Sequence, residues 1–78
     1  MIQLKIKLTS IGDVQKFVNA VSAFSGDIDL RSGRYVVDAK SIMGIFSLDL
    51  SKPILVEVHS DDAAADEFVA SLAKFIVE

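Results

Sequence analysis

The side chains that most often do chemistry in proteins are scarce in this sequence. Its 78 residues include a single histidine, His59, and no cysteine. A serine–histidine–acid triad would therefore have to use His59. This histidine ends an alternating segment, on the side predicted to face away from the core, which is typical of an ordinary surface histidine. We therefore predict that the chain is not an enzyme.

A metal site at this histidine would need further ligands. Glu57 shares its predicted strand face, and Asp61 and Asp62 follow in the sequence. The two aspartates are better explained as the start of a helix, so a zinc-type site lacks a third ligand. The four glycines are isolated, so no Gly-rich phosphate-binding loop is present. We expect neither a metal nor a cofactor.

The most distinctive stretch covers residues 38–48. Ser41 stands where it would cap a short helix, and Gly44 permits close packing. The stretch has more large apolar side chains than one face of a two-turn helix can bury: Ile42, Met43, Ile45, Phe46 and Leu48. We therefore predict that some of them point outward and form a docking surface for a protein partner. The predicted contact residues are Lys40, Ile42, Met43 and Phe46.

The first half of the chain predicts a strand followed by a helix. Residues 2–8 alternate between apolar and polar types, which indicates a half-buried strand. The period then changes, and an apolar stripe from Ile11 to Phe24 predicts a helix over residues 11–23. Ser10 is its predicted N-cap, with Asp13 completing a box-like pair, and Gly26 follows as the expected C-terminal glycine.

The second half predicts a hairpin, a short helix, a strand and a final helix. The hairpin joins residues 27–31 to residues 34–38 around a glycine turn. A short helix over 41–48 and a strand over 54–59 come next. The last helix is expected to start at Ser60-Asp61-Asp62. Its buried stripe comprises Ala65, Phe68, Val69, Leu72, Phe75 and Ile76.

These elements predict a single domain, residues 1–78, of the α+β class in the order β-α-β-β-α-β-α. A four-stranded antiparallel sheet with three helices on one face is the economical arrangement. With 51% hydrophobic residues the chain can build a core without disulfides. The other sheet face should be open to water and carry the polar alternates Gln3, Lys5, Lys7, Glu57 and His59.

The run Lys40-Ser-Ile-Met-Gly44, followed by an apolar pair, Ser and Leu, closely resembles the regulatory-serine segment of HPr, the phosphocarrier protein of the bacterial sugar phosphotransferase system. The resemblance extends from Ile2 to about Ile76 and includes the element order and the Ser-Asp-Asp start of the last helix. It implies the HPr-like open-faced sandwich. It also implies that Ser41 matches a serine that an ATP-dependent kinase phosphorylates, after which the modified protein docks on a transcriptional repressor.

The sequence departs from the family at the phosphoryl-accepting histidine. HPr proteins carry this histidine at the start of the first helix, in the motif Gly-Ile-His-Ala-Arg-Pro-Ala. Counting back from Ser41 without gaps, Ser10 and Gly12 stand where the family has its acceptor histidine and arginine. No shift of the alignment restores the site, because no histidine precedes His59 and no arginine precedes Arg31. A phosphoryl group on a serine oxygen would be a stable ester, so onward transfer would stall.

We therefore predict a regulatory or binding module of the HPr family that acts through Ser41 and its apolar neighbours. The alternatives are a phosphocarrier protein of the sugar phosphotransferase system and an unrelated small ligand-sensing domain. Expected partners are a kinase, a transcriptional regulator or a phosphotransferase component. The net charge of −3 argues against nucleic acid. No apolar run approaches the roughly 20 residues that a membrane span needs, and no signal peptide is evident, so we expect a cytoplasmic location and no membrane contact.

Overall fold

The computed structural model describes residues 1–60 and 62–77. The elements in chain order are β1 (Ile2–Ile6), α1 (Ile11–Ala23), β2 (Ile28–Ser32), β3 (Tyr35–Asp38), α2 (Ile42–Phe46), β4 (Ile54–Val58), α3 (Ala63–Ser71) and the 3₁₀ turn η1 (Ala73–Phe75). In this described part of the chain, no helix combines the length and the apolar character that crossing a membrane requires.

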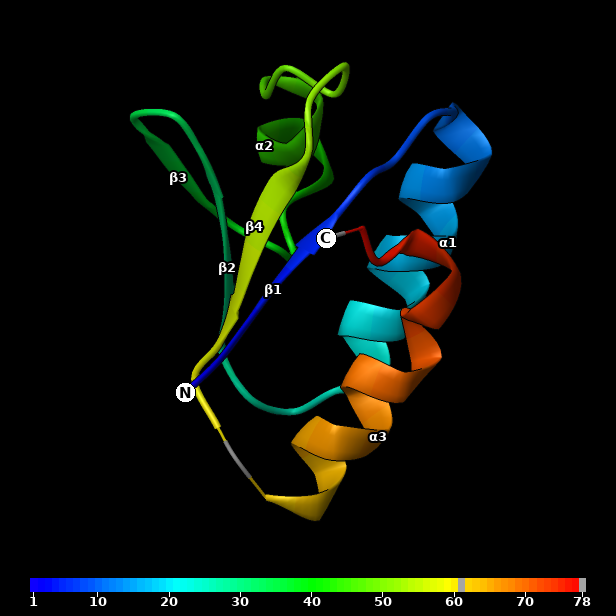
Figure 1. Ribbon diagram of the computed structural model, residues 1–78, viewed down its shortest axis with the longest axis vertical. Helices are drawn as coiled ribbons and strands as arrows, with labels where there is room; N and C mark the ends of the chain where they lie inside the picture. Colours follow the sequence, from blue (N-terminus) through cyan, green and yellow to red (C-terminus); the bar gives the residue numbers. More distant parts are fainter. Residues whose placement is uncertain (61, 78) are drawn as a thin grey trace.

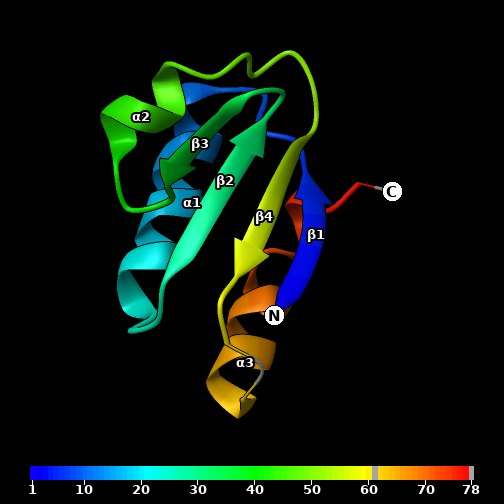
Figure 2. The same cartoon turned by 90° about the vertical axis from the view of Figure 1, so that its left-hand side faces the viewer.

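The four strands form one antiparallel sheet in the order β1-β4-β2-β3. The helices lie on one side of this sheet, with α1 and α3 against the middle and α2 beside β3 (Figure 1). Figure 2 looks onto the opposite face, which no helix covers. The predicted α+β open-faced sandwich is confirmed, including the hairpin between β2 and β3, and β1 pairs with β4.

The hairpin turns through Gly33, the one residue with a positive φ among those described, at 59°. Ser32 pairs with Tyr35 across the turn, so Gly33 and Arg34 form a two-residue loop. Such loops fit the twist of the strands when a glycine occupies the first position. This turn sets the register of β3 and therefore the place where α2 begins.

The core lies between the sheet and the helices. Alternate strand residues such as Ile6, Leu30 and Val56 are fully buried, and they meet Val14 and Phe17 of α1. Burial of each such side chain stabilises the fold by roughly 1.5–3 kcal/mol. These contacts confirm the predicted alternation of the strands and most of the predicted stripe of the first helix.

The last helix is shorter than predicted. It ends at Ser71, and η1 then turns the chain so that Ile76 bridges to Ile6 instead of extending the helix. The backbone N–H of Lys7 donates to the carbonyl of Phe75 at 2.8 Å, and that of Val77 donates to the carbonyl of Lys5 at 2.9 Å. The tail thereby provides hydrogen-bond partners for backbone groups at the free edge of β1. Helical periodicity in the sequence does not reveal that this edge needs such partners.

Helix boundaries needed two further corrections. The N-cap of α3 is Asp62, whose carboxylate accepts from the backbone N–H of Ala65 at 2.9 Å, and not Ser60 as expected. Asp61 lies outside the described residues. Gly26 is not a left-handed C-cap, because α1 ends with Phe24 in an extended conformation. Gly26 is instead required for space, since an added Cβ would lie 2.6 Å from the Phe24 ring.

The open sheet face carries a polar cluster centred on Glu57. We expected this carboxylate to face water, but Glu57 is only 7% exposed. Arg31 donates to it at 2.6 Å and Gln3 at 2.9 Å. Because β4 is a central strand, side chains from both neighbouring strands fold over Glu57. The hydrogen bond from Arg31, followed by that from Gln3, lowers the pKa of this carboxyl group below its ordinary value of 4.5.

This cluster predicts a pH-dependent contribution to stability. Since the pKa of Glu57 is lower in the folded chain than in the unfolded one, its contribution is complete above pH 4.5 and is lost as the pH falls through the folded-state pKa. The Glu57→Gln variant should have a lower melting temperature than the wild type near neutral pH. Its melting temperature should also depend less on pH in the acid range than that of the wild type.

The matched control is Glu67→Gln, which neutralises an exposed glutamate of α3. It should keep the acid dependence of the wild type. Equal acid profiles for Glu57→Gln and the wild type would contradict the role given to the cluster.

Candidate functional site

Ser41 is exposed and caps α2. Its hydroxyl oxygen accepts from the backbone N–H of Gly44 at 3.2 Å, and its own N–H donates to the carbonyl of Asp38 at 2.9 Å. Gly44 is tightly placed, since an added Cβ would lie 3.2 Å from both the Ser41 hydroxyl and the Cβ of Val37. This close approach of α2 to β3 holds the Ser41 hydroxyl at the surface.

The apolar residues of α2 divide between the core and the solvent, as the sequence predicted. Ile45 is fully buried and Leu48 is 6% exposed. Met43 is 78% exposed, Phe46 44% and Ile42 39%. The neighbouring Lys40 is also exposed. One short helix therefore anchors itself by Ile45 and presents three large apolar side chains to solvent.

The start of α1 extends this apolar area. We expected Ile11 in the buried stripe, but it is 68% exposed because it opens the first turn of α1, beyond the covered part of the sheet. A hollow of about 390 Å³ joins Ser10 and Ile11 to Phe46 and Leu50. We call Ile11, Ile42, Met43 and Phe46 together the α1–α2 surface. No sequence signal pointed to Ile11, because its spacing fits the buried stripe.

Ser10 is the N-cap of α1, as predicted. Its hydroxyl oxygen accepts from the N–H of Asp13 at 3.1 Å. The Asp13 carboxylate does not reach Ser10, since it accepts from the N–H and the hydroxyl of Thr9 at 3.0 and 2.8 Å. These two bonds, the backbone one first, lower the pKa of Asp13. The carboxylate is thus held away from the Ser10 hydroxyl, and no other described residue is placed as a base to activate that hydroxyl.

His59 lies at the opposite end of the sheet from Ser10. β4 runs antiparallel to β1, so the end of β4 meets the start of β1, whereas Ser10 follows the end of β1 (Figure 1). The His59 Nε2 atom is 2.8 Å from a carboxylate oxygen of Asp29. Within residues 1–60 and 62–77, no three metal-ligating side chains gather at one place. His59 therefore cannot stand in for an acceptor at the start of α1.

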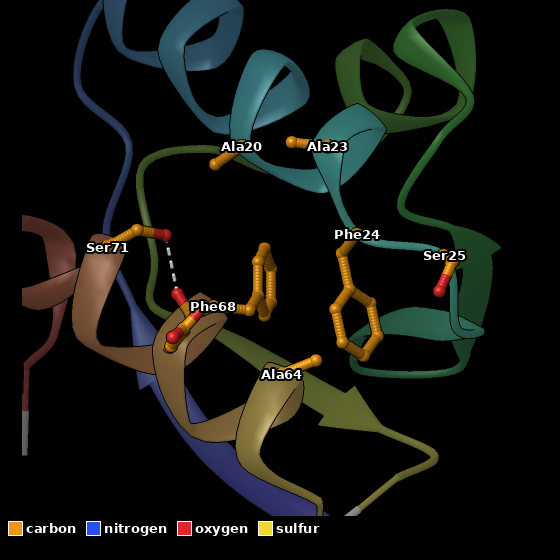
Figure 3. Close-up of a pocket in the computed structure, with 8 residues that line it drawn as sticks. Ala20, Ala23, Phe24, Ser25, Ala64, Phe68 and Ser71 are labelled. Atoms are coloured by element: carbon orange, nitrogen blue, oxygen red, sulfur yellow. Dashed lines mark hydrogen bonds between the residues drawn. The ribbon is translucent and has the colours of Figure 1, made fainter.

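A second hollow lies between α1 and α3, away from these serines (Figure 3). It is about 290 Å³ in volume and is lined mainly by small side chains around Phe24 and Phe68. The rings of these two residues stack with centroids 5.3 Å apart. The stack joins the end of α1 to α3, and the small alanines and serines around it leave the hollow open. We assign it a structural role.

The capping role of Ser10 can be measured. Ser10→Ala removes the acceptor for the Asp13 N–H and should cost about 1 kcal/mol of stability. For a domain of this size, that corresponds to a fall of roughly 4–8 °C in melting temperature. Ser10→Thr keeps a hydroxyl and serves as the control, with a melting temperature close to that of the wild type. An unchanged melting temperature for Ser10→Ala would remove the capping argument.

Comparison with known proteins places this geometry in a family. A family model described as the PTS HPr component phosphorylation site matches residues 13–78, which begin just after Ser10 and Gly12. No curated protein sequence matches the chain.

Among solved structures, HPr-C-His from Thermoanaerobacter tengcongensis is 28% identical, with a TM-score of 0.77 over 95% of this chain and 89% of that chain. The phosphocarrier protein HPr from Bacillus anthracis is 26% identical, with a TM-score of 0.66 over 91% of this chain and 95% of that chain. Crh from Bacillus subtilis shares the fold at 24% identity and a TM-score of 0.63, over 100% and 93% of the two chains. The family model covers most of the chain and the fold agrees, so the chain belongs to the HPr family of phosphocarrier proteins.

Proposed function

We propose that this protein is a regulatory or binding module of the HPr family that acts through Ser41 and the α1–α2 surface. One observation carries the proposal: an exposed serine hydroxyl stands directly beside Ile42 and Met43, two large apolar side chains that the fold leaves in solvent. Contiguous exposed apolar side chains mark interaction sites on small domains. Membership of the family supports phosphorylation at Ser41, which matches the regulatory serine of its members.

A phosphate on Ser41 would change the chemistry of this surface without dismantling α2. It brings nearly two negative charges and three acceptor oxygens. The ester oxygen can still accept from the Gly44 N–H, so the cap is retained. Lys40 supplies a cation next in the chain. The modified surface suits a cytoplasmic protein that offers an arginine for the phosphate and an apolar pocket for Met43.

The alternative function is that of a phosphocarrier of the sugar phosphotransferase system, which family membership favours. The residues at the start of α1 argue against this carrier function. Ser10 is committed to the helix cap, and a serine ester is a poor donor for onward transfer. The one histidine, His59, lies at the other end of the sheet.

Phosphorylation is tested with an ATP-dependent HPr kinase and tandem mass spectrometry. We expect one phosphate, located at Ser41, and none on Ser41→Ala. Ser47→Ala removes an exposed serine at the other end of the same helix and should be phosphorylated like the wild type. Absence of phosphate from Ser41, both in this reaction and in protein isolated from cells, would remove the regulatory role.

Docking is tested by comparing Ser41→Asp with Ser41→Ala against a transcriptional regulator of the kind that binds phosphorylated HPr. The Asp variant should bind more tightly. Met43→Ala in the Asp background should weaken binding by about fivefold or more, the usual effect of truncating a central contact residue. Val36→Ala removes another exposed apolar side chain, from β3 and outside the α1–α2 surface, and should leave binding unchanged. Equal binding of the Asp and Ala variants contradicts the proposal.

The carrier alternative is tested with phosphoenolpyruvate and the general phosphotransferase enzyme, with a histidine-containing HPr as positive control. We expect no acid-labile phosphate on this chain. Gly12 has room for a side chain, with the Ser10 hydroxyl as nearest contact at 3.6 Å, so Ser10→His/Gly12→Arg can be built. Stoichiometric acid-labile phosphate on the wild type would establish the carrier function instead.

A further inference from the structure

A cleft of about 400 Å³ lies between the start of α1 and the C-terminal segment. Figure 1 shows this segment returning beside α1 after α3. Three parts of the chain line the cleft: the β1–α1 connection with Lys7 and Thr9, the first turns of α1 with Asp13 and Lys16, and the tail with Lys74, Phe75 and Val77. It has no residue in common with the α1–α2 surface.

The cleft gathers positive charge in a chain of net charge −3. Among the described residues that line it, Lys7, Lys16 and Lys74 contribute three ammonium groups and Asp13 contributes one carboxylate. The ion pairs found in residues 1–60 and 62–77 join other side chains, Arg31 with Glu57 and His59 with Asp29. The lining residues within 1–60 and 62–77 therefore carry a net charge of +2.

Contacts within the chain hold the side chains of Lys7 and Lys74, and their ammonium groups still have N–H donors available for a ligand. The Lys7 ammonium donates to the carbonyl of Ser51 at 2.8 Å, which uses one of its three protons. The Lys74 ammonium lies 5.3 Å from the centroid of the Phe75 ring, a cation–π contact that uses none of its protons. The charges of Lys16 and Lys74 act on Asp13, whose pKa is lowered first by its hydrogen bonds with Thr9 and then also by these two lysines, whereas the charge of Lys7 acts on Asp49.

We propose that this cleft binds a small phosphate-bearing molecule, with the phosphate among Lys7, Lys16 and Lys74. Ammonium groups from three separate chain segments suit a tetrahedral anion with several acceptor oxygens better than a planar carboxylate. Phe75 and Val77 provide an apolar side for the organic part of the ligand. The volume is in the range of small-molecule sites. The binding is non-covalent and does not depend on Ser41.

The experiment is an amide chemical-shift titration of the ¹⁵N-labelled chain at low salt. Glycerol 3-phosphate and inorganic phosphate are the two probes, and glycerol is the neutral control. We expect saturable shifts at Thr9, Lys16 and Val77 with both phosphates and none with glycerol. Tighter binding of the ester assigns the site to a phosphorylated metabolite, and equal binding assigns it to the phosphate group alone.

Lys16→Gln/Lys74→Gln should weaken phosphate binding by about tenfold or more, since hydrogen bonds to charged groups are worth this much each. Arg34→Gln/Lys52→Gln removes the same charge from exposed positions outside the cleft and should bind within about twofold of the wild type, allowing for long-range screening. Ser41→Ala should bind like the wild type, which separates this proposal from the regulatory one.

Three results would overturn the site: no saturable shift in the cleft, equal weakening by the two double variants, or a phosphoserine peptide that binds far more tightly than the ester. The last result would assign the cleft to a protein partner.

Discussion

The central position of β4 is the constraint on which the rest of the molecule depends. β4 pairs with β1 on one side and β2 on the other, both antiparallel, so β1 and β2 run in the same direction. Both therefore end at the same edge of the sheet, where α1 begins and where the hairpin turns from β2 into β3. The same pairing carries His59 to the other edge. The direction of one strand thus places Ser10 and Ile11 at the edge opposite the only histidine. The helix α2 follows β3 and reaches them through Phe46, which lines a hollow with Ser10 and Ile11.

The short helix α2 links stability to function. A helix of five residues is not stable by itself, and tertiary packing must hold it. Ile45 and the close contact of Gly44 with Val37 supply that packing. Because so few residues are needed for anchoring, Ile42, Met43 and Phe46 are left for solvent or for a partner. The proposed phosphorylation of Ser41 would therefore change the α1–α2 surface while the core beneath it stays the same.

The C-terminal segment has a comparable double role. By pairing with β1 it covers an edge that would otherwise attract other strands. The same pairing brings Lys74 to the cleft that Lys7 and Lys16 also line. Three lysines that are distant in the sequence therefore line one cleft, because the turn at η1 brings the tail back to the start of α1.

The sequence by itself determined the elements, the fold class and the parts of the site that lie close together in the chain. Periodicity located α1 and its cap Ser10, and one continuous run identified Ser41 with its exposed neighbours. The errors of the sequence-based predictions share one cause. Ile11 and Glu57 were assigned to the wrong environments because periodicity gives the face of an element and not what covers that face. Ile76 was assigned to the last helix, but it bridges to Ile6 because the open edge of β1 offers hydrogen bonds to the tail. Only the tertiary structure decided that Ile11 joins α2, that Arg31 and Gln3 enclose Glu57, and that three lysines meet at a cleft. Each of these depends on contacts between segments far apart in the chain, which local spacing does not encode.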